Sequence, residues 1–259
     1  MNEGHGGVKI KTEANIQEPE TINPELTRNF VDFIKEKAKT GTYRTEVKVG
    51  DVVIPIDVYP TVFPPRSDYS VSSKSVFETF GNLQNLEVAD VGSGSGIESI
   101  VAVMAGAHHV DAADINQQAV DCSKHNVDIN NLKDSIEVFH SDLFSNFPKK
   151  RYDLIIANLP IVNFNADNTP INQALYDKGF EIHKRLFVEA KEFLVKNGII
   201  TFPHANLQSA KTANPNYDFD VLETLLDEYG YEIVEKTERE DLGYKWINYK
   251  IKIKIIPQG

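Results

Sequence analysis

One segment decides the fold of this 259-residue chain: Val88-Ala89-Asp90-Val91-Gly92-Ser93-Gly94-Ser95-Gly96-Ile97-Glu98. The apolar run that ends at Val91 predicts a strand with one acid near its end, and the residues after the glycines predict an apolar helix. Glycine permits positive φ and lets a ligand approach the backbone. The helix start behind the glycines offers free N–H groups and a partial positive charge. The segment therefore predicts a strand, a ligand-binding turn and a helix.

The spacing of the glycines narrows the choice of ligand. A dinucleotide fingerprint has the pattern G-x-G-x-x-G, whereas this chain has G-x-G-x-G with Asp90 two residues before the first glycine. An acid disfavours a pyrophosphate but suits a cofactor that carries a sulfonium and an amino group. The segment resembles motif I of class I S-adenosylmethionine-dependent methyltransferases. The alternative is a tight turn that binds nothing, although three closely spaced glycines cost stability.

Composition and charge limit the class of protein. The length suits one large α/β domain with an N-terminal extension. No apolar stretch is long enough to span a membrane, the first residues lack the pattern of a signal peptide, and Cys122 is the single cysteine. We therefore expect a cytoplasmic protein without a membrane partner. The formal net charge of -11 disfavours nucleic acid as a partner, because such binding depends on Lys and Arg.

Residues 1–76 are predicted to form an N-terminal extension that covers the substrate site. It would contain a loose tail, a helix from Asn23 to about Lys39, a β-hairpin from Tyr43 to Tyr59 and a proline-rich loop. The loop at residues 60–70 is too rich in proline for regular structure and too apolar for a solvated loop. It is either functional or a rigid linker. A helix from Ser73 to Gly81 would then lead into the main domain.

Residues 77–259 alternate strands and helices, which predicts an α/β domain. We expect a Rossmann-like, seven-stranded, mostly parallel sheet with helices on both faces. Strands are predicted at residues 86–91, 109–113, 136–140, 152–157, 199–202, 231–236 and 244–256. Helices are predicted at residues 97–105, 117–126, 174–196 and 219–229.

A polar residue marks the end of each of the first four strands: Asp90, Asp114, Asp142 and Asn158. Ligands of open α/β sheets bind beyond the carboxyl ends of the strands. One acid in such a place is commonly a helix cap. Four polar ends in succession, after a glycine-rich turn, predict a shared site.

The chain from about Phe77 to Ile256 resembles a class I methyltransferase domain. Within it, Asn158-Leu159-Pro160-Ile161 is similar to the (Asn/Asp)-Pro-Pro-(Tyr/Phe) motif of small-domain enzymes that methylate amino and amide nitrogens, including those of ribosomal RNA and of release-factor glutamine. The resemblance implies S-adenosyl-L-methionine as cofactor and S-adenosyl-L-homocysteine as product. It implies no metal, and the sequence has no clustered His/Cys spacing that predicts one.

The resemblance also implies roles by position. The implied cofactor-binding residues are Asp90, Gly92, Gly94, Gly96, Asp114, Ile115, Asp142, Leu143 and Asn158. Asp90 would lie near the methionine amino group, Asp114 would accept hydrogen bonds from the ribose hydroxyls, and Asp142 would accept one from the adenine amino group. The implied catalytic group is Asn158, Leu159 and Pro160, in which the Asn158 amide oxygen and the Leu159 carbonyl hold the substrate nitrogen.

Two positions depart from that motif, because Leu159 replaces its first proline and Ile161 replaces its stacking aromatic residue. The expected substrate-binding residues are therefore Tyr69, Ile161, Phe164 and His204, of which Tyr69 or Phe164 would supply the missing aromatic face. His204 is included because it follows the fifth strand.

The main prediction is an N-methyltransferase that acts on the amine or amide nitrogen of a small molecule. The alternative is a protein glutamine or asparagine amide methyltransferase. RNA base methylation and a non-catalytic subunit with a cofactor fold are less favoured. Only the Asn158 motif favours nitrogen over oxygen or carbon as the acceptor.

Overall fold

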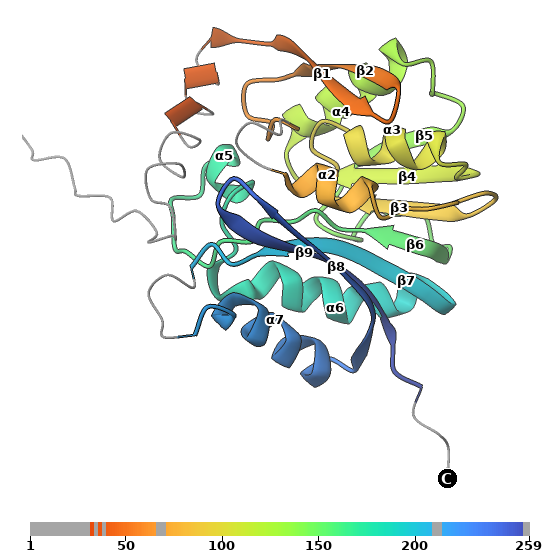
Figure 1. Ribbon diagram of the computed structural model, residues 1–259. Coiled ribbons are helices and arrows are strands. Elements are labelled where there is room, and N and C mark those ends of the chain that lie inside the picture. The colour runs from red at the N-terminus through yellow and green to blue at the C-terminus, as the bar shows by residue number, and fades with distance from the viewer. Residues whose placement is uncertain (1–31, 34–35, 38–39, 66–70, 209–213, 256–259) are drawn as a thin grey trace, which may run out of the picture.

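The computed structural model describes residues 32–33, 36–37, 40–65, 71–208 and 214–255. The expected tail, most of the helix up to Lys39, and Tyr69 lie outside these residues. At the centre lies a seven-stranded sheet in the order β5-β4-β3-β6-β7-β9-β8 (Figure 1). The strands from β5 to β7 run parallel, whereas β9 is antiparallel to both of its neighbours. The predicted seven-stranded, mostly parallel sheet is confirmed.

The strands of this sheet agree with the prediction in number and order along the chain, although β7 and β8 are longer than predicted. Their bounds are β3 Glu87–Val91, β4 His109–Asp114, β5 Ile136–His140, β6 Tyr152–Ile156, β7 Leu194–Ala205, β8 Tyr231–Asp241 and β9 Tyr244–Ile253. The inner strands β3, β4 and β6 are mostly buried, because helices cover both faces of the sheet. In β3, Val88 packs into one core, while Ala89 and Val91 pack into the other.

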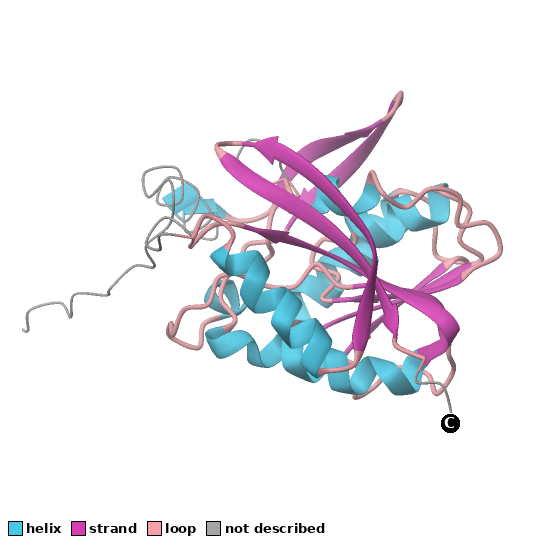
Figure 2. Ribbon diagram, turned by 60° about the horizontal axis from the view of Figure 1, so that its bottom comes forward, coloured by secondary structure: helices cyan, strands magenta, loops and turns pink. Residues whose placement is uncertain are grey.

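Helices cover both faces of the sheet (Figures 1 and 2). On one side lie α2 (Ser72–Phe77), α3 (Ile97–Met104) and α4 (Gln117–Ile129), and on the other lie α6 (Glu181–Phe193) and α7 (Tyr217–Glu228). Among the described residues, none of the helices combines the length and apolar character that a bilayer crossing requires.

The predicted hairpin is present as β1 (Tyr43–Val49) and β2 (Val52–Val58). It packs on α4 through Asp57 and Asn126: the Asp57 N–H donates to the Asn126 Oδ1 at 2.8 Å, and the Asn126 Nδ2 donates to the Asp57 carbonyl at 2.8 Å. The Arg44 guanidinium bonds the Asp57 carboxylate at 2.7 and 2.8 Å and lowers its pKa to about 2. The hairpin is therefore fixed to the main domain.

The prediction of a single helix across residues 174–196 is wrong. The chain forms instead a short helix α5 (Pro170–Gln173), a 3-10 turn η1 (Lys178–Phe180) and the helix α6, and β7 starts directly after α6. Gly179 and Phe180 have φ values of +65° and +57°, in the left-handed region that a continuous helix excludes.

Buried Asp177 explains why α6 starts where it does. Its carboxylate oxygens accept hydrogen bonds from the backbone N–H groups of Ile182 and His183, at 2.9 and 3.1 Å. N–H groups in the first turn of a helix have no acceptor within the helix, so Asp177 supplies one. The same carboxylate contacts the His183 Nδ1 at 2.7 Å. Asp177 thus caps α6 from four residues before its first residue.

Candidate active site

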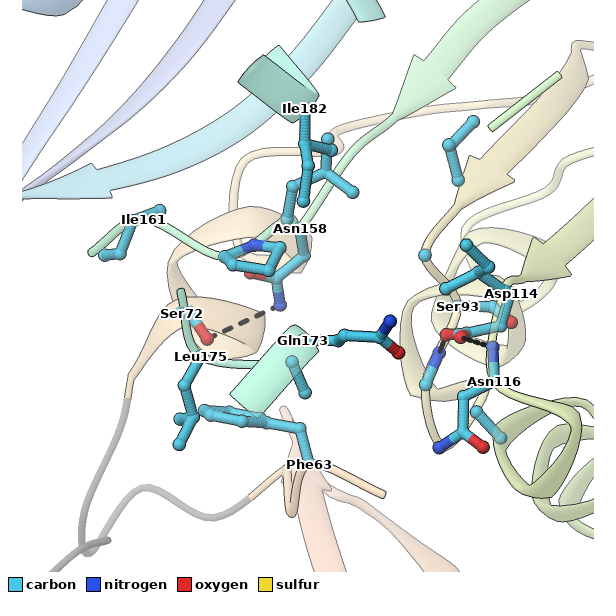
Figure 3. A pocket seen from close by; sticks show the side chains of 18 of the residues that line it. Phe63, Ser72, Ser93, Asp114, Asn116, Asn158, Ile161, Gln173, Leu175 and Ile182 are labelled. Carbon is cyan, nitrogen blue, oxygen red and sulfur yellow. Dashed lines mark hydrogen bonds between the residues drawn. The ribbon is translucent and has the colours of Figure 1, made fainter. Parts of the chain in front are cut away.

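A cavity of about 310 Å³ lies at the carboxyl ends of β3, β4, β5 and β6 (Figure 3). This volume is at the lower end of the range for small-molecule sites, roughly 300–1,000 Å³. The expected site residues that line it are Gly92, Gly94, Asp114, Ile115, Asp142, Leu143, Asn158, Leu159, Pro160 and Ile161. The ends of four neighbouring strands therefore contribute to one cavity.

Four other expected residues do not line it. Asp90 is buried behind the turn, where its Oδ2 accepts from the Ser99 hydroxyl at 2.5 Å. Gly96 faces α4, and a Cβ atom there would lie 2.5 Å from the Ser123 Oγ. This glycine is therefore needed for close packing of the turn on α4 rather than for ligand access.

Phe164 and His204 do not line the cavity either. The Phe164 ring packs against Tyr176, with centroids 5.3 Å apart. His204 is fully buried beside Phe180 and Phe219, and this burial lowers its pKa to about 3. Its neutral ring belongs to the packed interior.

The first two glycines of the turn differ in what surrounds them. Gly92 has a φ of +80°, and a Cβ atom there would lie 2.9 Å from the Leu159 Cδ2. Gly94 has a φ of +53°, but a Cβ atom there would meet no heavy atom within 4 Å. Gly92 thus lets the turn approach Leu159, while Gly94 leaves open space at the cavity.

Asp114 connects the glycine-rich turn to the start of α4. Its Oδ2 accepts from the Gly94 N–H at 3.0 Å and its Oδ1 accepts from the Asn116 N–H at 2.8 Å. Burial raises the pKa of this carboxyl, while the two backbone N–H groups favour its ionised form. Each carboxylate oxygen retains a lone pair for a further donor in the cavity.

Asp142 already has a cationic partner. The Arg185 NH1, from α6, lies 3.0 and 3.1 Å from its two carboxylate oxygens, and this contact raises the pKa of Arg185. Both residues line the cavity. Sequence reasoning missed Arg185, because its partner Asp142 lies 43 residues away in the chain.

Asn158 is held by a second residue that sequence reasoning missed, Glu98. The Asn158 Nδ2 donates to the Glu98 Oε1 at 2.6 Å and lies 3.3 Å from the Ser73 hydroxyl. It also lies 3.4 Å from the Ser72 hydroxyl (Figure 3). Glu98 lines the cavity, although it is only 4% exposed. The available sequence signal was an acid in the first turn of an otherwise apolar helix.

The proline-rich loop and β9 supply an apolar part of the wall. Val62 and Phe63 come from the loop, and Tyr244 and Trp246 come from β9. The Asn116 Nδ2 fixes the loop by donating to the carbonyl and hydroxyl oxygens of Thr61, at 3.2 and 2.9 Å. The described part of the loop, residues 60–65, therefore lies against the cavity rather than away from it.

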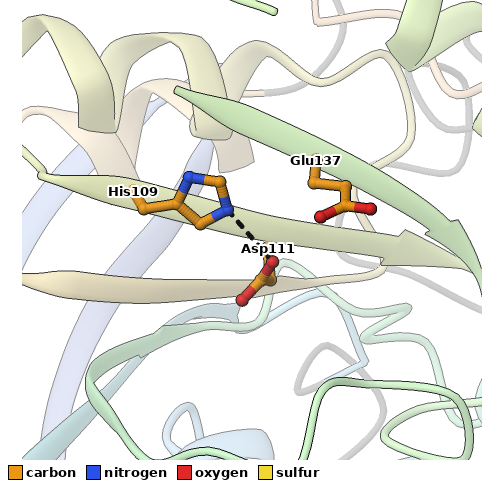
Figure 4. A group of neighbouring side chains, drawn as sticks. All are labelled: His109, Asp111 and Glu137. Carbon is orange, nitrogen blue, oxygen red and sulfur yellow. Dashed lines mark hydrogen bonds and ion pairs between the residues drawn. The ribbon is translucent and has the colours of Figure 1, made fainter. Parts of the chain in front are cut away.

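A separate group of polar side chains lies outside the cavity, on β4 and β5 (Figure 4). Possible metal-ligand atoms of His109, Asp111 and Glu137 lie within 4.8 Å of one another. The buried Asp111 carboxylate, however, already contacts the Lys150 ammonium at 2.7 Å and accepts from the Tyr152 hydroxyl at 2.9 Å. Lys150 thus supplies the positive charge that this group requires.

Comparisons with known proteins point to one family. The family model described as "Methyltransferase small domain" matches residues 59–235. A Methanocaldococcus jannaschii protein named "Putative protein N5-glutamine methyltransferase" is 30% identical over 163 residues, which are 61% of this chain and 79% of that protein. A Francisella tularensis protein named "Ribosomal protein uL3 glutamine methyltransferase" is 28% identical over 167 residues, which are 60% of this chain and 53% of that protein.

The fold comparison agrees with the sequence comparison. The solved structure of a T. thermophilus 16S rRNA N2 G1207 methyltransferase, in complex with AdoMet and guanosine, has a TM-score of 0.57 and 17% sequence identity. The match covers 83% of this chain and 51% of that one. At this identity the likeness concerns the fold alone.

Proposed function

Because the chain belongs to the methyltransferase small domain family, we propose that it transfers a methyl group from S-adenosylmethionine to the side-chain amide nitrogen of a protein, with glutamine as the favoured acceptor. The observation that carries this proposal is the position of Asn158 on the wall of the cavity that Gly94 and Asp114 also line. The two relatives described above support the choice of acceptor, because each is named as a methyltransferase that acts on glutamine in a protein.

These relatives correct the expectation of a small-molecule substrate, which is wrong. That expectation rested on the net charge of -11 and on the aliphatic side chain of Ile161. Negative charge argues against a polyanion but does not distinguish a small amine from a protein. The aliphatic Ile161 is also a weak argument, because Phe63, Tyr244 and Trp246 add aromatic surface to the same cavity.

The chemistry of the cavity fits a cationic cofactor. Its wall contains Glu98 and Asp114, and among the described lining residues the one Lys or Arg is Arg185, which Asp142 engages. When bound, S-adenosylmethionine supplies an electrophilic methyl group on a sulfonium sulfur. We assign Asp114 to the ribose hydroxyls and the apolar side chains of Ile115 and Leu143 to the adenine ring. The open space at Gly94 leaves room for the ligand beside the backbone.

In the proposed reaction, Asn158 and Leu159 orient the acceptor. The Asn158 amide oxygen and the Leu159 carbonyl would accept hydrogen bonds from the two N–H groups of the substrate amide, so that the nitrogen lone pair would face the methyl group. Transfer would form the N–C bond as the C–S bond of the cofactor breaks with its electrons on sulfur, and the nitrogen would release one proton to solvent. An amide nitrogen is a weak nucleophile, so positioning and stabilisation of its developing positive charge supply the rate.

We assign residues 61–63 and 71–73 of the extension to the substrate side of the cavity. Val62, Phe63, Ser72 and Ser73 line the cavity, and Thr61 is tied to Asn116 in the main domain. This arrangement supports the proposal that residues of the 1–76 extension cover the substrate.

Mass spectrometry tests the proposal. The protein is incubated with cofactor that carries an isotopically labelled methyl group and with a total protein extract that includes ribosomes. We expect the label on the side-chain amide of a glutamine within a defined peptide. Label found only on lysine, on an N-terminal amine or on RNA would contradict the proposal.

A further inference from the structure

The buried carboxylate of Glu98 requires an explanation. It lies in the first turn of α3 between Ile97 and Ile100, which are both core residues, and it is 4% exposed. Removing a carboxylate from water is costly unless hydrogen bonds compensate. The helix N-terminus supplies part of the compensation. The remainder comes from side chains at the cavity wall.

Two side chains donate to Glu98. The Asn158 Nδ2 lies 2.6 Å from the Oε1, and the Ser73 hydroxyl also forms a hydrogen bond with the carboxylate. Burial raises the pKa of Glu98, whereas these two donors favour its charged form. Asp90 lies close enough that Glu98 raises its pKa in turn, in addition to the larger effect of burial. Because Glu98 has two side-chain donors, Asn158 and Ser73, whereas Asp90 has one, the Ser99 hydroxyl, we assign the ionised form to Glu98.

An ionised carboxylate restricts the orientation of an amide group that it contacts. It has acceptors only, so it must face the NH₂ group of Asn158 and not the oxygen. The amide group is planar, so fixing the nitrogen toward Glu98 turns the Asn158 Oδ1 away from it. In the opposite orientation, the NH₂ group would face the N–H bonds of the substrate, donor against donor.

We propose that Glu98 is a positioning residue that sets the orientation of the Asn158 side-chain amide, so that the Asn158 Oδ1 accepts from the substrate nitrogen. This inference rests on the role proposed above for Asn158. The fold makes the contact rigid, because α3 follows β3, Asn158 follows β6, and these two strands pair directly from Val88↔Leu154 to Asp90↔Ile156. The Ser72 and Ser73 hydroxyls extend the contact to α2.

A charge-swap experiment tests the pair. Asn158→Asp alone places two carboxylates together and should lower kcat by about 100-fold, the typical loss for one oriented group. In the double variant Glu98→Gln/Asn158→Asp, the new amide at position 98 donates to the new carboxylate at position 158, whose second oxygen still accepts from substrate. We expect the double variant to regain at least about tenfold in kcat over Asn158→Asp. A merely structural role for Glu98 would not produce this recovery of kcat at unchanged cofactor affinity.

A double variant no faster than Asn158→Asp would overturn the inference. NMR provides a measurement that does not depend on activity. The ¹⁵N-labelled side-chain amide signals of Asn158 are assigned by their loss in Asn158→Asp and are then followed in Glu98→Leu. We expect a downfield proton in the wild type that moves upfield in Glu98→Leu, whereas unchanged signals would overturn the contact. If the wild type methylates no amide in the labelling assay, the proposed function fails, whereas the NMR result tests the Glu98–Asn158 contact separately.

Discussion

Replacing Asp114 with alanine is predicted to reduce cofactor affinity by about 100-fold or more. In the proposed complex, this carboxylate accepts hydrogen bonds from two ribose hydroxyls, each contributing about 1.5–3 kcal/mol when the acceptor is charged. Two such bonds amount to about 3–6 kcal/mol, and each 1.4 kcal/mol is about tenfold in affinity. We expect the lower end of that range, because water will replace part of the loss. The substitution also removes the acceptors of the Gly94 and Asn116 N–H groups, which hold the turn in place.

Asp142→Ala is the matched control. This carboxylate also lines the cavity, but it is 46% exposed and Arg185 already engages it. Exposed ion pairs and exposed acceptors contribute little, so we expect a loss of about tenfold or less. The assay is calorimetric titration of S-adenosylhomocysteine into the wild type and both variants, with thermal unfolding to verify that each variant is folded.

The two variants separate the assigned roles. Affinity of folded Asp114→Ala within about threefold of the wild type, a difference below 1 kcal/mol, would refute the assignment of the ribose site. A larger loss for Asp142→Ala than for Asp114→Ala would refute the ranking of the two acids.

Two further predictions concern stability. Asp177→Ala should lower the free energy of unfolding by about 3 kcal/mol, because it removes the cap of α6 and leaves the His183 ring without its acceptor. A loss below about 1 kcal/mol, measured by urea titration, would contradict this role of Asp177. Burial lowers the pKa of His204 to about 3, whereas the pKa of this histidine in the unfolded chain is about 6.5. Because the unfolded chain binds the proton more tightly, His204 lowers the free energy of unfolding by about 1.4 kcal/mol for each pH unit that the pH falls between these values. His204→Leu should flatten that part of the stability profile, and an unchanged slope would be evidence against it.

The elements that sequence predicted well are those with a local signal. Glycines at alternate positions defined the turn at Gly92, and a polar residue after each apolar run defined the strand ends at Asp114 and Asn158. Because parallel strands align their carboxyl ends, these residues meet in the same cavity. The β1–β2 hairpin was predicted equally well, since Gly50-Asp51 provides a turn between two runs of strand-forming residues.

The features that sequence missed depend on burial and on specific side-chain contacts, most of them between distant segments. Residues 174–196 are composed largely of helix formers, and the break appears only when Asp177 is buried against His183 and the backbone at Gly179 becomes left-handed. Glu98 looked like an ordinary first-turn acid, because its partner Asn158 lies 60 residues away in the chain. Arg185 beside Asp142 was missed for the same reason, as was the burial of His204.

The most direct test of the proposed function compares the wild type with Asn158→Ala on the protein acceptor identified by methyl labelling. With saturating cofactor, we expect kcat to fall by about 100-fold or more, while the Kd of S-adenosylhomocysteine changes by less than about threefold. Asn165→Ala, at an exposed asparagine in the loop that follows, should retain full activity. Unchanged turnover of Asn158→Ala would contradict the proposed mechanism.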